Sequence, residues 1–336
     1  MPEPTATTTA TSGTTTSGTT TTGTGPALAP GSPPPSGQLT RPVEREFTIK
    51  ERSQLRQATR RFLRHRAAVV SLGVLIAMAL FAFVGPLVWT HDYRFLNGPS
   101  NAKPNIHYPM GTDNLGHDVM AQVMRGTQQS IKVALLIAVL ATVAGSIWGV
   151  VAGFLRGWVD SGLMRLADLI LTIPGLALAA AIARSQARHA SSGWWIIGII
   201  LGSLSAPYVA RVVRGMVLSL REREYIEASR ALGATNGRIM SRHLIPNAFA
   251  VVIVNATLLV AAGILGETAL SFFGFGIQAP DTSLGLLVSA GQGAVFTRPW
   301  LFYFPGLFII VFALSVNFVG DGLRDALDPQ QTRQRR

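Results

Sequence analysis

Long apolar stretches separated by short charged segments dominate the chain from residue 67 onward. Six of them are close to the length of roughly 20 residues that a helix needs to cross the hydrocarbon core of a bilayer. They cover residues 67–89, 133–155, 166–183, 193–210, 248–273 and 299–320. In lipid a helix satisfies its own backbone polar groups. The pattern therefore predicts an all-α, polytopic membrane protein with six transmembrane helices.

The two ends of the chain lack this pattern. Residues 1–40 are rich in Thr, Gly, Ser and Pro and carry one charge, Glu3, which leaves too little apolar surface to offset the entropy of ordering. Residues 41–66 are basic and suit a short amphipathic helix on a membrane surface. We expect a disordered tail (1–40), a basic juxtamembrane segment (41–66), a membrane domain (67–327) and a C-terminal tail (328–336).

Charge supports this interpretation and orients it. Charged residues make up 14% of the 336 residues, against about 25% in soluble domains. The net charge is +12, and with the N-terminus inside, most of the 29 Lys and Arg residues fall on the inner side. Because Lys and Arg favour the cytoplasmic side, we expect both termini in the cytoplasm and the chain in the cytoplasmic membrane. The arginines flank apolar spans rather than alternating with aromatic residues, so no nucleic-acid partner is expected.

Enzyme motifs are missing from the sequence. A P-loop needs Gly-Lys followed by Ser or Thr, and none of the three lysines, Lys50, Lys103 and Lys132, follows a glycine. His-Glu-x-x-His and Gly-x-Ser-x-Gly are absent, and there is no cysteine. His107 and His117 have no third ligand nearby, so no metal site is expected. We expect a non-catalytic chain without a cofactor of its own.

The segment 211–247 carries the most specific local pattern. Gly233 interrupts a helical run that begins at Arg221, and a second short helix is expected from Arg238 until it stops before Pro246. Spacings of three and four place on one face Tyr225, Ala228, Ser229 and Leu232. Small residues around one acid, Glu227, are typical of a knob that fits a groove on another protein. The alternative is a solvated loop that follows the positive-inside rule.

This segment resembles the EAA loop of bacterial ATP-binding cassette (ABC) import permeases, with Glu-Ala-Ala, three residues, Gly, nine residues, Ile, one residue and Leu-Pro in order. The matching positions are Glu227, Ala228, Ser229, Gly233, His243, Ile245 and Pro246. Ser229, His243 and Ile245 depart from the pattern, His243 most. The resemblance implies a type I ABC importer permease whose elbow is a coupling helix on the ATPase. The residues it assigns to coupling are Tyr225, Glu227, Ala228, Ser229, Leu232, Gly233, Ala234, His243 and Pro246.

Other segments are similar to the dipeptide, oligopeptide and nickel branch of that family, and to its C-type subunit. Residues 108–119 look like the Gly-Thr-Asp-x-x-Gly-Arg-Asp stretch after the first span, with His117 in place of Arg, and residues 266–280 and 304–329 look like the end of the subunit. A short helix at 116–125, capped by Asp113 or Asn114, is expected here. It is either a platform for an extracytoplasmic binding protein, with contacts from Thr112, Asp113, Gly116, His117 and Asp118, or a cover over the cavity between spans.

The resemblance also implies partners. These are a homologous second permease, two ABC ATPase subunits that carry ATP and Mg, an extracytoplasmic substrate-binding protein and the lipid membrane. The expected cargo is a dipeptide or oligopeptide, moved by alternating access. Nickel or a short oligosaccharide carried by the same machinery is the alternative cargo. A secondary transporter driven by an ion gradient and a membrane scaffold without transport are the competing classes.

Two acids lie within the predicted spans. An ionisable group inside a membrane is expensive and usually faces a cavity or a partner. Asp168 and Glu267 are therefore either groups of a translocation pathway, which contact a peptide amino terminus or a metal cation, or packing acids near the membrane interface. A packing acid would pair with Arg165, which is three residues from Asp168, or would cap a helix.

Overall fold

The computed structural model describes residues 54–96, 98–186 and 193–327. The predicted tails at 1–40 and 328–336, and residues 41–53 of the basic segment, lie outside these ranges. The chain divides into two units, Met1–Glu51 and Arg52–Arg336, and only the second is described below. Its described residues are helical with irregular connections, which confirms the all-α prediction.

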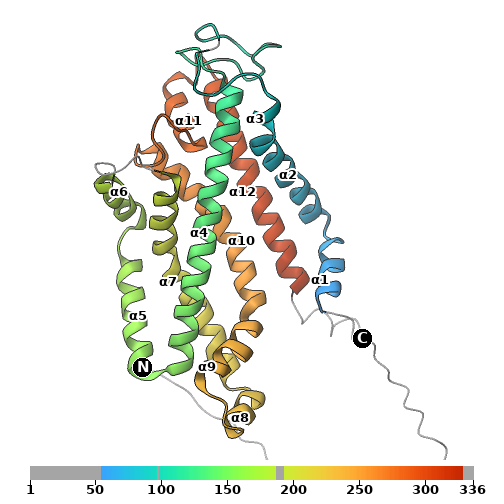
Figure 1. The fold of residues 1–336 in the computed structure, drawn as a ribbon, viewed down its shortest axis with the longest axis vertical. Helices are drawn as coiled ribbons and strands as arrows, with labels where there is room; N and C mark the ends of the chain where they lie inside the picture. The colour runs from blue at the N-terminus through green and yellow to red at the C-terminus, as the bar shows by residue number, and fades with distance from the viewer. Residues whose placement is uncertain (1–53, 97, 187–192, 328–336) are drawn as a thin grey trace, which may run out of the picture. The chain divides into compact units, whose positions relative to one another are not determined.

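Twelve helices follow one another in the described residues (Figure 1). They are α1 (Gln54–Phe62), α2 (Arg66–Phe83), α3 (Gly85–Val88), α4 (Val119–Leu155), α5 (Gly157–Thr172), α6 (Gly175–Gln186), α7 (Trp194–Arg221), α8 (Glu224–Ala231), α9 (Asn236–Ile239), α10 (Ile245–Phe272), α11 (Leu284–Gly291) and α12 (Trp300–Leu327). A π-helical turn, Met240–Leu244, joins α9 to α10, and a 3₁₀ turn, Gln292–Ala294, follows α11. Helix α1 supplies the amphipathic helix expected within 41–66.

Five helical stretches in the described residues are long and apolar enough to span a membrane. They are Arg66–Val88, Val119–Leu155, Trp194–Arg221, Asn236–Phe272 and Trp300–Leu327. The pair α5 and α6 makes a sixth span if it is counted as one, but its halves meet at 83°. The span predicted at 166–183 therefore corresponds to a bent pair of helices that meet at Pro174. Ile173 is extended, as a residue before proline prefers, and Pro174 cannot continue the helical hydrogen bonds.

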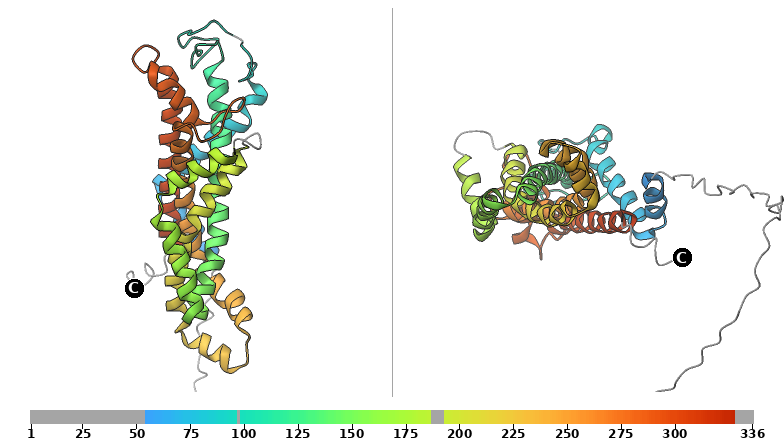
Figure 2. Two further views of the ribbon diagram at one scale, coloured as in Figure 1. Left: turned by 90° about the vertical axis from the view of Figure 1, so that its left-hand side faces the viewer. Right: turned by 90° about the horizontal axis from the view of Figure 1, so that it is seen from below.

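Helix α4 lies at the centre of the bundle and packs most extensively against α7 (Figure 2, right). Gly145, Gly149 and Gly153 recur at every fourth position along the contact. A Cβ atom at Gly145 would lie 2.5 Å from the carbonyl oxygen of Ala206, and one at Gly149 would lie 2.5 Å from that of Ala210. Small residues at this spacing let two helix backbones approach closely in a membrane. The α4–α7 pair thus forms a tightly packed centre for the described fold.

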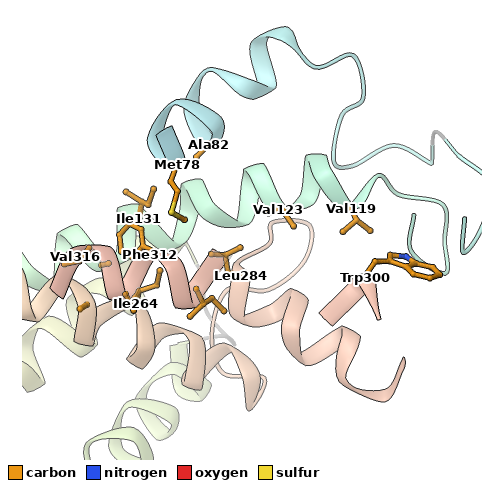
Figure 3. Packing of buried hydrophobic residues seen from close by; sticks show 14 residues of the cluster. Met78, Ala82, Val119, Val123, Ile131, Ile264, Leu284, Trp300, Phe312 and Val316 are labelled. Carbon is orange, nitrogen blue, oxygen red and sulfur yellow. The ribbon is translucent and has the colours of Figure 1, made fainter. Parts of the chain in front are cut away.

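A second packing centre joins α2, α4, α10, α11 and α12 (Figure 3). Its larger side chains include Met78, Val123, Ile131, Ile264, Leu284, Trp300, Phe312 and Val316. Helix α11 lies against α4, α10 and α12. The segment 89–118 lies at one end of the bundle, and α8 and α9 lie at the opposite end (Figure 1). The two motifs found in the sequence therefore occupy opposite ends.

Candidate functional site

The connection between α7 and α10, residues 222–244, is called the elbow below. Its first helix, α8, ends in a Schellman motif: the N–H of Gly233 donates to the carbonyl of Arg230 (2.9 Å), and that of Ala234 donates to the carbonyl of Ser229 (3.0 Å). Gly233 adopts φ +81°, which glycine reaches without strain. Thr235 then caps α9 by accepting the Arg238 N–H. The break predicted at Gly233 is therefore a defined turn.

Three fully buried aliphatic side chains anchor the elbow to the bundle. Ile226 of α8, Ile239 of α9 and Leu244 of the π-helical turn join a cluster that includes Phe154 of α4 and Val217 of α7. Burial of each such side chain contributes about 1.5–3 kcal/mol. Ile226 was missing from the face predicted from spacing, although it is the only large aliphatic residue within α8. The elbow is held firmly against the ends of α4 and α7.

Charged side chains also stabilise the contact between the elbow and the ends of α4 and α7. The Arg221 guanidinium donates to the carbonyl of Phe154 (2.7 Å) and lies over the Phe154 ring, and Arg230 lies over the same ring at 5.2 Å. Arg156, at the end of α4, pairs with Glu222 at 2.9 Å. Arg156 and Arg221 on the bundle side and Arg230 on the elbow thus help to hold the elbow against α4.

The outward face of the elbow is different in character. Glu227, Ala228 and Gly233 are exposed, and Leu232 is 88% exposed. Within the described residues, the Glu227 carboxylate has no hydrogen bond and no ion pair. A Cβ atom at Gly233 would meet open space. A short exposed segment that carries an unpaired acid, a leucine and small residues suits a surface that another protein covers.

The remaining predicted coupling residues lie around this face. The Ser229 hydroxyl donates to the carbonyl of Tyr225 within α8 (2.7 Å). The rings of Tyr225 and His243 lie 6.2 Å apart, Ala234 is half-buried and Pro246 is exposed. Eight of the nine predicted residues therefore lie in the elbow, and Pro246 follows in the first turn of α10.

The helix stop predicted before Pro246 is wrong. The helical run continues from Asn236 to Phe272 without a break, because the turn at Met240–Leu244 is π-helical. There the N–H of Ile245 donates to the carbonyl of Met240, five residues back. A wider turn at this point accommodates the missing N–H and the ring of Pro246. Consequently α9 and α10 form one continuous helix rather than two segments.

At the opposite end, residues 98–118 form what we call the loop knot. Asp118 is fully buried and accepts hydrogen bonds from the indole N–H of Trp89 (2.6 Å) and the backbone N–H of Met120 (2.8 Å), and it contacts His91 Nδ1 at 3.0 Å. Thr112, also fully buried, donates to the carbonyl of Pro99 (2.6 Å). The side chains of Thr112 and Asp118 form hydrogen bonds within the chain and have no exposed surface that a partner could contact.

Asp113 and Gly116 complete the knot. The Asp113 carboxylate accepts the backbone N–H groups of Leu115 and His117, both at 2.9 Å, and contacts His117 Nδ1 at 2.8 Å. Gly116 has φ +91°, and a Cβ atom there would lie 2.3 Å from the carbonyl oxygen of Gly98. The helix start predicted here is wrong: Asp118 caps α4 at Val119, and neither Asp113 nor Asn114 does.

The two acids within spans differ in their surroundings. Glu267 is fully buried and accepts from the hydroxyls of Ser130 (2.9 Å) and Ser271 (2.6 Å), so it ties α10 to α4. This placement favours the packing interpretation. Asp168 is half-exposed and pairs with Arg211 of α7. The pairing expected with Arg165 is therefore wrong, since the partner comes from a neighbouring helix.

Comparison with known proteins gives two matching family models. The model described as "Binding-protein-dependent transport system inner membrane component" matches residues 145–333, and the model described as "N-terminal TM domain of oligopeptide transport permease C" matches residues 53–105.

Individual relatives are similar over most of the chain. The oligopeptide transport system permease protein OppC of Mycobacterium tuberculosis H37Rv is 39% identical over 278 residues, which are 82% of this chain and 95% of the relative. The protein of the same name from Escherichia coli K12 is 39% identical over 289 residues, 85% of this chain and 94% of the relative. The dipeptide transport system permease protein DppC of Alkalihalophilus pseudofirmus is 35% identical over 303 residues, 90% and 95% of the two chains.

Proposed function

The chain belongs to the family of inner membrane components of binding-protein-dependent transport systems, and from this premise we propose that it is a peptide-importing permease subunit whose elbow docks on a partner ATPase. The observation that carries the docking is the exposed surface of the elbow, where Glu227 of α8 is unpaired and Leu232, directly after α8, is uncovered. The names of its relatives support dipeptides or oligopeptides as the cargo.

The remaining subunits follow from this assignment. A second, homologous permease completes the membrane pathway, two ABC ATPases bind ATP and Mg, and an extracytoplasmic binding protein delivers the peptide. The elbow then lies in the cytoplasm together with both termini, and the loop knot lies outside. This chain contributes no catalytic group of its own.

The attachment of the elbow couples a displacement of α8 to the long helices of the bundle. Ile226 ties α8 to α4 and α7, and the continuous run from Asn236 to Phe272 ties α9 to α10. When the ATPases close and displace α8, these three long helices receive the displacement through the buried contacts of Ile226 and through the continuous helix that begins at Asn236. A shift of packed helices between two arrangements is an established way to alternate access.

Uptake in cells tests the cargo. A strain that lacks the gene and one that carries it are compared for uptake of a labelled dipeptide, a longer oligopeptide and nickel, each with and without depletion of ATP. We expect loss of peptide uptake in the deletion strain and in the ATP-depleted cells. Unchanged peptide uptake in the deletion strain contradicts the cargo assignment, and uptake that follows an ion gradient in ATP-replete cells contradicts the ATP-driven class.

Cross-linking tests the docking. The natural chain has no cysteine, so Leu232→Cys introduces a single thiol at the tip of the elbow. We expect a short thiol-directed cross-linker to join it to the ATPase in membranes of cells that make the whole complex. Ile106→Cys is the matched control, since Ile106 is 90% exposed in the loop knot. Equal capture of the ATPase by both positions contradicts the docking assignment.

A further inference from the structure

Two ion pairs bridge α5 and α7, and they differ in how completely they are satisfied. Arg214 binds Asp160 with two parallel hydrogen bonds, Nε to Oδ1 at 2.6 Å and Nη2 to Oδ2 at 2.7 Å, and the side chains are 33% and 15% exposed. Arg211 binds Asp168 through Nη2 alone, and the side chains are 49% and 51% exposed. The second pair thus keeps unused guanidinium N–H donors and a free carboxylate oxygen at an accessible surface.

The exposed pair lies well within its spans. Helix α7 has 28 residues, about 42 Å, and exceeds a hydrocarbon core of about 30 Å by about 6 Å at each end when it is centred. Arg211 is ten residues from the end of α7 at Arg221, or about 15 Å, which places it about 9 Å inside such a core. A half-exposed ion pair at this depth is too costly to face lipid tails.

The exposed face of α7 changes character along the helix. Trp195 and Ile199 are exposed near its start, whereas the second half exposes, at spacings of three and four, Tyr208, Arg211, Gly215 and Ser219, of which only Gly215 has no polar side-chain group. The exposed face of α4 offers the contrast, since its most exposed positions are all aliphatic: Leu135, Val139, Val143 and Ile147. The α4 face suits lipid or another apolar helix, whereas the α7 face suits water.

We propose that the Asp168–Arg211 face lines the aqueous translocation path and that Arg211 contacts the free carboxylate of the peptide in transit. This inference rests on the proposed function. Arg165 lies one turn before Asp168 and has no ion-pair partner within the described ranges, so the local charge is net positive and favours a carboxylate. Asp168 orients the guanidinium and competes with the substrate for it. That competition keeps the contact weak enough for release, which a transport path requires.

The first test measures the uptake rate of a saturating labelled tripeptide by the complete importer, normalised to the amount of this chain in the membrane. We expect Arg211→Gln to lower the rate roughly tenfold, since a hydrogen bond to a charged group is lost. Arg211→Lys, which keeps the charge, recovers most of it. The matched control is Arg214→Gln, in the more buried pair on the same helix, which lowers the amount of protein but leaves the normalised rate near that of the natural chain. A normalised rate for Arg211→Gln equal to that of the natural chain overturns the proposal.

The second test does not require an Arg211 variant to fold. Tyr208 is 52% exposed and Val139 is 60% exposed, so Tyr208→Cys and Val139→Cys form a matched pair in the cysteine-free chain. In membranes that contain the assembled importer, we expect a water-soluble maleimide to label Tyr208→Cys and to spare Val139→Cys. An unreactive Tyr208→Cys means that a subunit or lipid covers this face, which overturns the proposal. Failure of the natural chain to import any peptide removes the proposed function instead, and leaves the labelling result standing.

Discussion

The loop knot and the elbow both contain a recognisable motif, but they use it in opposite ways. In the knot, the polar atoms of Thr112 and Asp118 are buried and have partners within the chain. In the elbow, Glu227 is exposed and has no partner among the described residues. A motif whose polar groups are satisfied internally holds a loop in shape, whereas an exposed acid without an internal partner is available to another molecule. Changes in the knot should therefore act on stability, and changes in the elbow on coupling.

The largest effect is expected at Asp118. Asp118→Ala removes the acceptor for the Trp89 indole and for the first turn of α4, and leaves these half-buried donors without partners. We expect a loss of about 3–5 kcal/mol of folding free energy, visible as a large drop in the thermal unfolding temperature of the purified protein. Asp118→Asn keeps one acceptor oxygen for the cap and should lose less. Equal losses for the two variants contradict the internal-tie role.

The next largest effect is the difference in folding free energy lost when two glycines are each replaced by alanine. Gly116 and Gly233 both have positive φ, but a Cβ atom at Gly116 would lie 2.3 Å from the Gly98 carbonyl oxygen and one at Gly233 would meet open space. Gly116→Ala should therefore cost about 3 kcal/mol or more, and Gly233→Ala only about 1 kcal/mol for the strained backbone. Thermal unfolding of both variants measures the difference. Similar losses of folding free energy at the two sites would contradict the view that the turn at Gly116 is packed and the turn at Gly233 is open.

These contrasts show what the sequence encodes locally. The apolar spans and the break at Gly233 could be predicted, because run length and a glycine signal depend on neighbouring residues alone. The α5–α6 bend and the π-helical turn before Pro246 could not, because proline permits either a kink or an accommodated helix and packing decides between them. The inward position of Ile226 was missed since α8, at eight residues, is too short for a clear period. The partner of Asp168 lies 43 residues away, beyond any local pattern.

A smaller effect is expected at Glu227. Glu227→Gln removes the unpaired charge of the elbow without changing its size, so the unfolding temperature should stay the same. Loss of a charge pair across an interface should lower ATP-dependent uptake roughly three- to tenfold. Glu224→Gln, another exposed acid on α8, is the matched control and should leave uptake unchanged. If both substitutions lower uptake equally, general charge on α8 matters rather than a contact made by Glu227.

The smallest effect is a pH-dependent change in stability at Asp281, an acid at the same end of the bundle as the loop knot. Burial alone would raise the pKa of Asp281, but hydrogen bonds from Arg125, at 2.8 Å to each oxygen, and from the backbone N–H of Thr282 hold this pKa below its usual value.

A folded-state pKa below the unfolded value of about 3.9 means that the contact contributes fully at higher pH and is lost as the pH falls through the folded value. The difference in unfolding temperature between the natural chain and Asp281→Asn should therefore stay constant from about pH 8 to pH 5. It should shrink only in stronger acid. A difference that already shrinks near neutral pH would mean that Asp281 is not held ionised by its partners, and would weaken the view that acids at this end of the bundle are satisfied within the chain.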